Sequence, residues 1–384
     1  MKSRSSGRAG QNGVILVLNC GSSNIKCALF DLESVPHERR PRWKGQVAAT
    51  YDSHGAALGQ VRQEAQAQLD GRSLAAIAHR VVHGGGRYVA PTLIDSEVLA
   101  DLRSYVPRAP LHQPLALEAV AAFCESDPQL RQVACFDTAF HHTMPKVEQM
   151  LALPRATWER GLRRYGFHGL SYEYLSLVLP ERHGDRARGR CIAAHLGSGA
   201  SLCAMQELRS IATTMGFSAL DGLMMGTRCG ALDPGVVLYL MESERLSVEQ
   251  VRRMLYLESG LAGVSGISPD VRVLLQREVT DEGARDALAL YVRRIVREIG
   301  ALTAVLGGLD LLVFTGGVGE HNAAIRERVC RDLAFLGMEL DDAANAEHAP
   351  LISASASRVA VAVEPTNEEW IAARAAFRLV NCSS

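Results

Sequence analysis

The stretch VLNCGSSNIKCALFD (residues 17–31) decides the fold class, because it places a glycine- and serine-rich turn between two apolar runs. The runs, residues 14–18 and 25–30, and the short polar turn between them are typical of a β-hairpin. A P-loop would instead open a helix and carry Ser or Thr after its lysine, whereas Lys26 is followed by Cys27. A turn of this kind presents backbone N–H groups and hydroxyls to an anion.

A second glycine-rich turn repeats the first at a constant offset of 176 residues. The matching positions are Gly21 with Gly197, Ser22 with Ser198, Cys27 with Cys203, and Ala28 with Ala204. Both turns lie between apolar runs, so the repeat predicts two related domains with one such hairpin each. Four matches among small residues can also arise by chance.

The composition is that of an ordinary globular protein of two-domain size, with 384 residues, 47% hydrophobic and 22% charged. A net charge of −1 gives no reason to expect a nucleic-acid or membrane-surface partner. No apolar run approaches the roughly 18 residues that a membrane span needs. The nine cysteines are scattered without a C-x-x-C pair, which predicts reduced, mostly buried thiols in the cytoplasm. Residues 1–12 are expected to form a flexible tail.

Strand and helix patterns alternate along the chain, which predicts an α/β fold. The expected elements are, in order, a helix end or a strand at 73–85, a helix at 112–126 with Pro114 in its first turn, a buried strand at 132–140 ending at Asp137, an irregular segment at 144–171, a strand–turn–strand at 191–206, a long amphipathic helix at 285–306, a strand at 309–321 opening into a glycine turn with a helix from about 322, and a strand, a turn and a final helix at 358–380.

The segment AHRVVHGGG (78–86) raises the question of a zinc site through His79 and His83. Zinc is disfavoured because the glutamate of H-E-x-x-H is missing. On a strand, His79 and Arg80 would also point to opposite faces. Arg80 precedes three glycines, so it is either an anion clamp or one half of a surface salt bridge.

Two further segments carry candidate charged groups. Asp137 follows a buried apolar strand, where a carboxylate caps a turn or holds a metal. The segment RYGFHG (164–169) carries Arg164 and His168, and for His168 a structural role is as compatible with the pattern as a functional one.

Two more candidates lie in the second half of the chain. Arg228 lies between glycines in MGTRCG (225–230), where a backbone can approach a ligand closely. Thr366 and Glu369 fit a T-x-x-E capping box at the start of the final helix. That interpretation makes Glu369 structural and leaves Glu368 to face a ligand.

Together these segments resemble the acetokinase family of acetate, propionate and butyrate kinases, from about residue 14 to residue 378. The motifs occur in order: NCGSSNIK (19–26), HRVVHGG (79–85), APLHQP (109–114), FDTAFH (136–141), YGFHG (165–169), HLGSG (195–199), MGTRCG (225–230), FTGGVGE (314–320) and PTNEE (365–369). The resemblance implies two duplicated ribonuclease-H-like α/β domains around an ATP cleft, as in actin, the heat-shock ATPases and sugar kinases. The domains are expected at residues 13–143 with 370–384 and at residues 144–369.

The resemblance also implies an activity. ATP would donate its γ-phosphoryl group to acetate by direct, reversible in-line transfer, giving acetyl phosphate and ADP, with Mg²⁺, or Mn²⁺ in its place, as the metal. The implied state is a cytoplasmic homodimer without nucleic-acid or membrane partners. A propionate-preferring kinase of short-chain carboxylates and a non-catalytic nucleotide-binding scaffold are the alternatives. A carboxylate acceptor is already ionised at pH 7 and needs no general base, so cationic groups must bring the two anions together.

The family motifs imply a role for each matching residue. Arg80, Asp137, His168 and Arg228 would be catalytic, with Asp137 on the metal side. Substrate contacts would come from Arg80, Val82, Leu111, Phe167 and Ala219. ATP would contact Ser22, Lys26, His195, Ser198, Gly199, Asp270, Val271, Arg272, Gly317 and His321, with His112 near the phosphates. Asn19 and Glu368 would hold the metal.

Four positions depart from the family pattern. Ser198 and His321 stand where Asn is usual, and Val271 stands where Phe is usual. These three changes put nucleotide affinity and base choice in doubt. Ala219 replaces a usual Pro in the acyl wall, which could widen the pocket for propionate.

Overall fold

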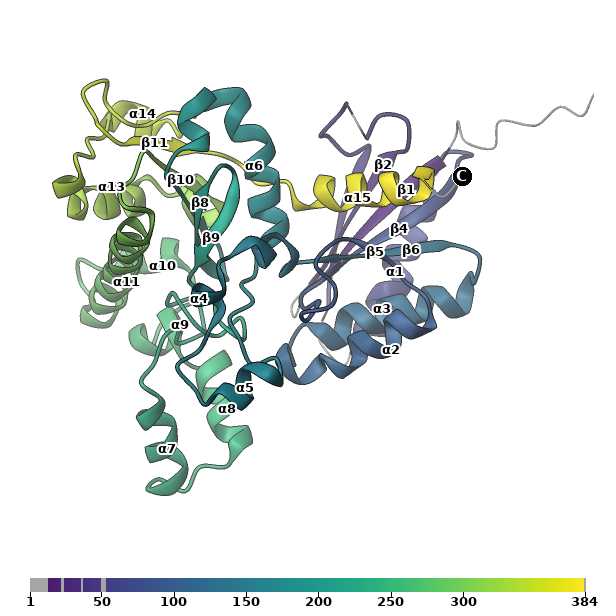
Figure 1. The fold of residues 1–384 in the computed structure, drawn as a ribbon, viewed down its shortest axis with the longest axis horizontal. Coiled ribbons are helices and arrows are strands. Elements are labelled where there is room, and N and C mark those ends of the chain that lie inside the picture. The colour runs from purple at the N-terminus through teal and green to yellow at the C-terminus, as the bar shows by residue number, and fades with distance from the viewer. Residues whose placement is uncertain (1–12, 22–23, 36, 50–52, 383–384) are drawn as a thin grey trace, which may run out of the picture. The chain divides into compact units, whose positions relative to one another are not determined.

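The computed structural model describes residues 13–21, 24–35, 37–49 and 53–382, which belong to two compact α/β units (Figure 1). Unit 1 consists of Met1–Phe140 and Asn367–Ser384, and unit 2 consists of His141–Thr366. The tail expected at residues 1–12 and the candidate Ser22 lie outside the described residues.

Unit 1 is built on a mixed six-stranded sheet in the order β3-β2-β1-β4-β6-β5. Its strands are β1 (Gly13–Cys20), β2 (Asn24–Asp31), β3 (Trp43–Ala48), β4 (Ser73–Val81), β5 (Thr92–Leu93) and β6 (Arg131–Phe136). Strands β1 and β2 form the predicted antiparallel hairpin, which is confirmed. Strands β1, β4 and β6 run parallel, so their carboxyl ends lie at one edge of the sheet.

Helices cover the sheet of unit 1. They are α1 (His54–Ala67), α2 (Ser96–Ser104), α3 (Gln113–Ser126) and α15 (Glu368–Cys382). Apolar residues of α1 and α3, including Val61 and Phe123, are buried against β1 and β2. Helix α15 packs against β4, β1 and β6, and the indole Nε1 of its Trp370 donates to the Val35 carbonyl at 3.0 Å.

The start of α15 differs from the capping box predicted from the sequence. Asn367 precedes the helix, and its Oδ1 accepts a hydrogen bond from the backbone N–H of Trp370 at 3.1 Å. The buried Thr366 Oγ1 has no hydrogen-bond partner in the described structure. Asn367 is therefore the capping residue, because the helix begins one residue later than the T-x-x-E pattern requires.

Unit 2 repeats the topology of unit 1. Its five-stranded sheet has the order β11-β10-β7-β8-β9, formed by β7 (Cys191–Leu196), β8 (Ala200–Gln206), β9 (Arg209–Thr213), β10 (Leu311–Thr315) and β11 (Ala360–Val363). Strands β7, β8 and β9 are antiparallel neighbours, whereas β7, β10 and β11 run parallel. The hairpins β1–β2 and β7–β8 thus hold the same place in their sheets, which confirms the predicted duplicated α/β fold.

The helices of unit 2 include the long amphipathic helix predicted at 285–306. They are α4 (Lys146–Gln149), α5 (Arg155–Glu159), α6 (Gly169–His183), α7 (Pro234–Glu242), α8 (Val248–Leu257), α9 (Gly260–Ser265), α10 (Val271–Arg277), α11 (Glu282–Leu306), α12 (Gly316–His321), α13 (Ala323–Asp332) and α14 (Asp342–Ala346). In α11, buried Leu288, Tyr291, Ile295 and Ile299 recur every three or four residues, as a helix with one apolar face requires.

The glycine turn predicted after β10 is instead the short helix α12. Its first residue, Gly316, has φ of 77°, and a Cβ there would lie 2.8 Å from the Leu196 carbonyl oxygen. Glu320 reaches back, and its Oε1 accepts from the Gly316 N–H at 2.9 Å. Gly316 therefore allows α12 to begin in close contact with the backbone of Leu196, where a side chain would not fit.

Two predictions about the whole chain concern cysteines and membrane spans. The eight cysteines whose side chains the structure describes are free thiols, and six of them are buried. Burial raises the pKa of Cys20 to about 12 and that of Cys27 to about 11, so both are protonated at neutral pH. Within the described ranges, no helix is both long and apolar enough to cross a membrane.

Candidate active site

In unit 1, three predicted residues meet at the carboxyl ends of parallel strands. Asn19 lies near the end of β1, Arg80 near the end of β4, and Asp137 directly after β6. Arg80 donates from Nε to Asp137 Oδ1 at 2.9 Å and from Nη2 to Asp137 Oδ2 at 2.7 Å. Its Nη1 donates to Asn19 Oδ1 at 3.2 Å. The guanidinium is therefore held in one plane by a fork that only arginine can make.

A second carboxylate approaches Arg80 from the first turn of α15. Glu368 Oε2 lies 3.7 Å from Arg80 Nη1. Burial by itself would lower the pKa of Arg80, but the charges of Asp137 and Glu368 outweigh burial and raise it above its ordinary value. Asp137 is only 1% exposed, so the Arg80–Asp137 pair is not the surface salt bridge that the sequence left open.

The side chains around Arg80 include oxygen donors of the type that Mg²⁺ takes. Asn19, Asp137 and Glu368 offer amide and carboxylate oxygens, which are hard ligands. Two carboxylates around one guanidinium leave a net negative charge that favours an added cation. Among the described residues, no cluster of three or more His, Cys, Asp and Glu side chains could hold a metal. Few protein ligands suit Mg²⁺, which keeps waters and binds substrate phosphates as well.

The structure describes four other candidates of unit 1. Lys26 is exposed and stands opposite Asn19 in the β1–β2 register, so both side chains lie on one face of the hairpin. Val82 is buried just beyond β4. Leu111 is partly buried, and His112 immediately precedes α3.

The histidines of HRVVHGG serve the core of unit 1. His79 Nε2 lies 2.7 Å from Gln132 Oε1, on the face of the sheet opposite Arg80. His83 accepts at Nδ1 from the Gly85 N–H at 2.9 Å. Burial lowers the pKa of His79 to about 4 and that of His83 to about 3, so both are neutral at pH 7.

In unit 2, two predicted histidines stack on each other. His168 precedes α6 with a left-handed backbone, φ 57° and ψ 25°, and His195 lies on β7. Their ring centroids are 4.2 Å apart and their planes differ by 20°. His168 Nδ1 lies 2.8 Å from Ser201 Oγ, and His195 Nδ1 lies 2.9 Å from Ser171 Oγ. Sequence reasoning missed both serines, because neither stands out by type or spacing.

Arg228 lies beside the same glycine turn as His168. A Cβ at Gly199 would lie 3.3 Å from His168 Nε2 and 3.7 Å from Arg228 Nη1. Arg228 Nη1 also donates to the carbonyl of Ala219, a residue predicted for the acyl wall, at 2.9 Å. The structure thus groups His168, Gly199, Arg228 and Ala219, while Ser198 is exposed in the turn and Phe167 is buried beside His168.

The residues predicted to border the nucleoside lie on or next to α10 and α12. Asp270 caps α10 by accepting from the Arg272 N–H at 2.8 Å, and it pairs with the Arg272 guanidinium at 2.6 Å. The bond from Arg272 lowers the pKa of Asp270. Val271 is 3% exposed and packs into unit 2. Gly317 and His321 are exposed at the two ends of α12, and space for a side chain is open at Gly317.

A buried arginine that the sequence analysis missed supports α12. Arg326 of α13 is fully buried, and its Nη1 donates to the carbonyls of Gly319 at 2.8 Å and Glu320 at 2.9 Å. Its Nε and Nη2 bond to the side chain and backbone of Asn345 at 2.8 and 2.7 Å. Burial lowers its pKa to about 10, so it remains charged at pH 7. The only sign of this burial in the sequence is that Arg326 lies on the apolar face of α13.

Arg164, the arginine of RYGFHG, also has a structural role. Arg164 Nη1 donates to the carbonyls of Thr213, Thr214 and Met215 at 2.9–3.2 Å. It thereby fixes the chain where β9 ends.

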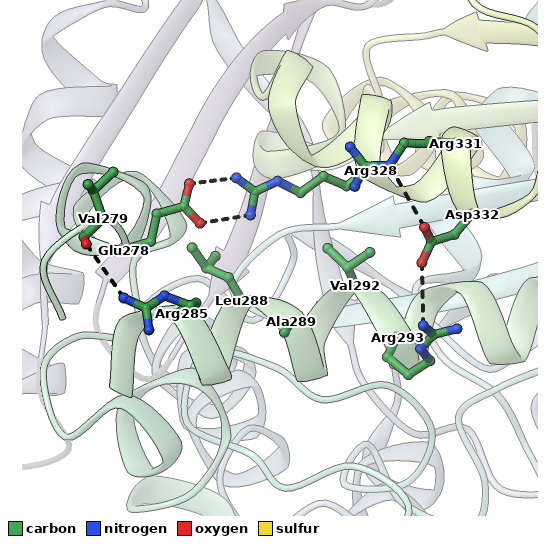
Figure 2. Close-up of a pocket in the computed structure, with 10 residues that line it drawn as sticks. All are labelled: Glu278, Val279, Arg285, Leu288, Ala289, Val292, Arg293, Arg328, Arg331 and Asp332. Atoms are coloured by element: carbon green, nitrogen blue, oxygen red, sulfur yellow. Dashed lines mark hydrogen bonds and ion pairs between the residues drawn. The ribbon is translucent and has the colours of Figure 1, made fainter. Parts of the chain in front are cut away.

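A pocket of about 510 Å³ in unit 2 lies outside these groups (Figure 2). Arg328 of α13 forms a fork with Glu278, with contacts of 2.9 and 2.5 Å. Arg293 and Arg331 both approach Asp332, at 3.8 and 4.0 Å. None of the predicted site residues lines this pocket, so we do not assign it to the candidate site.

Comparisons of the sequence and of the structure with known proteins identify the same family. The sequence model of the acetokinase family matches residues 14–374. Acetate kinases of Rhodopseudomonas palustris (strain TIE-1) and Methylocella silvestris are 49% and 44% identical, and each match covers 96% of this chain and 98% of the relative. A propionate kinase structure from Francisella tularensis has a TM-score of 0.85 at 33% identity, and an acetate kinase structure from Porphyromonas gingivalis has 0.81 at 35%. Each covers 94% of this chain and 98% of its own.

The network around Arg326 generates a stability prediction. Arg326→Lys keeps the charge but cannot reach all the acceptors that Arg326 satisfies. We expect the free energy of unfolding to fall by about 3 kcal/mol, because buried carbonyls are left unpaired. Guanidinium unfolding followed by circular dichroism measures it. Arg331→Lys on the same helix is the control, since that side chain is 65% exposed and should change stability by less than about 0.5 kcal/mol. Equal midpoints for the two variants would contradict this role.

Proposed function

The chain belongs to the acetokinase family, and from that premise we propose that it reversibly transfers the γ-phosphoryl group of ATP to acetate, giving acetyl phosphate and ADP. The observation that carries the proposal is the guanidinium of Arg80, held in one plane by the buried carboxylate of Asp137. An acceptor carboxylate is already ionised at pH 7, so the chain must supply oriented positive charge rather than a proton acceptor.

In this proposal, the two groups of residues act on different anions. Arg80 binds the acceptor carboxylate, and Asp137 orients Arg80 without taking a proton. Arg228 and His168 contact the transferred phosphoryl group. The glycine turn beside them, residues 197–199, donates backbone N–H groups to phosphate oxygens. The ordering of charged donors before reaction is what lowers the barrier to phosphoryl transfer.

Asn19 and Glu368, with Asp137 on the same side, are the residues that would hold Mg²⁺. When bound, Mg²⁺ neutralises phosphate charge as it develops. Lys26 is proposed to contact the phosphates, as are His112 and His195. Asp270, Arg272, Gly317 and His321 are proposed to border the nucleoside. Because ATP is the proposed donor and the described cysteines are free thiols, we place the protein in the cytoplasm.

Acceptor size and activity are tested together by trapping acyl phosphate with hydroxylamine. We expect hydroxamate from ATP, Mg²⁺ and acetate, and none when Mg²⁺ is removed with a chelator. We expect kcat/KM to rank acetate above propionate and butyrate. A clear propionate advantage would support the alternative suggested by Ala219, since one methylene is worth roughly 1–3 kcal/mol. Absence of hydroxamate with all three acids would refute the proposed kinase activity.

Replacing Arg228 tests the proposed phosphoryl site. Arg228→Ala should lower kcat by about 10²–10³-fold, because one donor to the developing charge is lost. Arg155→Ala is the control in the same unit, since its side chain is 90% exposed and its ion pair with Glu159 spans 3.9 Å. Activity of Arg228→Ala within threefold of the control would refute the role of Arg228. Circular dichroism and thermal unfolding show whether both variants are folded.

The homodimer is also part of the proposal, and α7 supports it. No residue of α7 is buried, although its sequence is PGVVLYLME. Leu238 is 56% exposed and Tyr239 is 57% exposed, and Val248 at the start of α8 is 58% exposed. We propose that a second copy of the chain covers these side chains. An apolar helix without a cover is costly in water.

Sedimentation of a charged variant tests this surface. Leu238→Glu is expected to convert the dimer to a monomer, because an unpaired carboxylate would be buried at the interface. Val147→Glu is the control, because Val147 is 75% exposed on α4, outside the proposed surface. A monomeric wild-type protein, or a Leu238→Glu variant that stays dimeric, would contradict the proposal.

A further inference from the structure

The stacked histidines of unit 2 are joined crosswise by two serines. Helix α6 and the residue before it supply His168 and Ser171, which are three residues apart and share a helix face. The hairpin β7–β8 supplies His195 and Ser201, which stand directly opposite each other in its register. Each histidine bonds through Nδ1 to the serine of the other element, at 2.8 and 2.9 Å. Both rings are therefore fixed by the packing of one helix on one hairpin.

A tyrosine extends one of these two bonds into a chain. Tyr172 OH lies 2.6 Å from Ser201 Oγ, and both residues are fully buried. Ser201 Oγ has one proton to share between Tyr172 and His168. A phenol is the stronger donor of the two hydroxyls, because its pKa is about 10. A bond donated by Tyr172 to Ser201 leaves the Ser201 proton for His168 Nδ1, and the imidazole proton then lies on Nε2.

Both Nε2 atoms lie on the side of the glycine turn. A Cβ at Gly199 would lie 3.3 Å from His168 Nε2, and a Cβ at Gly197 would lie 3.8 Å from His195 Nε2. Two imidazolium rings with centroids 4.2 Å apart would repel each other, and the guanidinium of Arg228 beside Gly199 adds to the repulsion. Two neutral rings avoid this repulsion, and a proton on each Nε2 gives an anion in the turn two N–H donors.

We propose that Ser171, Ser201 and Tyr172 are positioning residues, which hold His168 and His195 as neutral imidazoles with Nε2–H directed at the anion in the turn. This inference rests on the proposed phosphoryl transfer. A lone pair on Nε2 would repel phosphate oxygens, so the tautomer decides whether the pair attracts or repels the substrate. The left-handed backbone of His168 shows that the surrounding contacts, rather than local preference, hold this residue in place.

Nitrogen NMR of the histidine rings reads the tautomers without turnover. Protein labelled with ¹⁵N-histidine, with His168→Asn and His195→Asn variants to assign the signals, should show protonated Nε2 and unprotonated Nδ1 at both residues. In Ser201→Ala, the signals of His168 should move toward a mixture of tautomers. A wild-type spectrum with the proton on Nδ1 of either ring would overturn the proposal.

Kinetics supplies the second readout. Ser201→Ala should lower kcat by about 10–100-fold with little change in the KM for acetate, on the scale of other partners that orient a functional histidine. Tyr172→Phe should have a smaller effect in the same direction. An unchanged kcat in Ser201→Ala would overturn the proposal.

Two matched variants control for the loss of a buried hydroxyl. Ser210→Ala removes the bond from Ser210 Oγ to His141 Nδ1, which spans 2.9 Å and lies in the same unit. Tyr291→Phe removes a buried hydroxyl that has no hydrogen-bond partner in the described structure. Both should keep kcat within about threefold of wild type, and a loss in Ser210→Ala equal to that in Ser201→Ala would overturn the specific role. If wild type makes no acyl phosphate, the proposed function fails, and the ring spectra still decide the tautomers.

Discussion

Parallel pairing of strands on one side of an antiparallel hairpin is the constraint on which both units depend. It brings the carboxyl ends of β1, β4 and β6 to one edge of a sheet, and it does the same for β7, β10 and β11. A polar residue placed at such an end projects from a rigid, buried strand. Asn19 and Arg80 owe their fixed geometry to this arrangement, as does His195 in the second unit. The loops and helices then add groups to an edge that is already ordered.

The two units share one topology, but the acids at equivalent positions bind different partners. The N–H of Asp137 donates to the Val81 carbonyl at 3.1 Å, and the N–H of Glu364 donates to the Phe314 carbonyl at 3.0 Å, so both acids follow equivalent strands. Each acid is 1% exposed. Asp137 orients Arg80, whereas Glu364 binds Arg182 near the end of α6 at 3.0 Å. The same buried position therefore serves the candidate site in unit 1 and a helix end in unit 2.

The sequence predicted those features that depend on local pattern. Apolar runs on either side of residues 19–24 and 197–199 were enough to predict both hairpins. The helical periodicity of its apolar residues was enough to predict α11. Features that depend on distant partners were missed or wrong. Thr366 fitted a capping box, but the true cap, Asn367, depends on where α15 docks. Ser171 and Ser201 contact the histidines only because α6 packs on the β7–β8 hairpin, which the sequence does not show. The role of Arg326 depends on its contacts with Asn345 and α12, which the sequence alone does not show.

The glycine turn of unit 2 also limits how this chain can change over time. Side chains at positions 197 and 199 would press on the turn itself and on the imidazole of His168, and Ala200 is fully buried. Ser198 alone among these four residues is exposed. Mutational drift along this turn is thereby confined to one position. A substitution at position 198 therefore changes the surface of the turn without disturbing the residues packed beneath it.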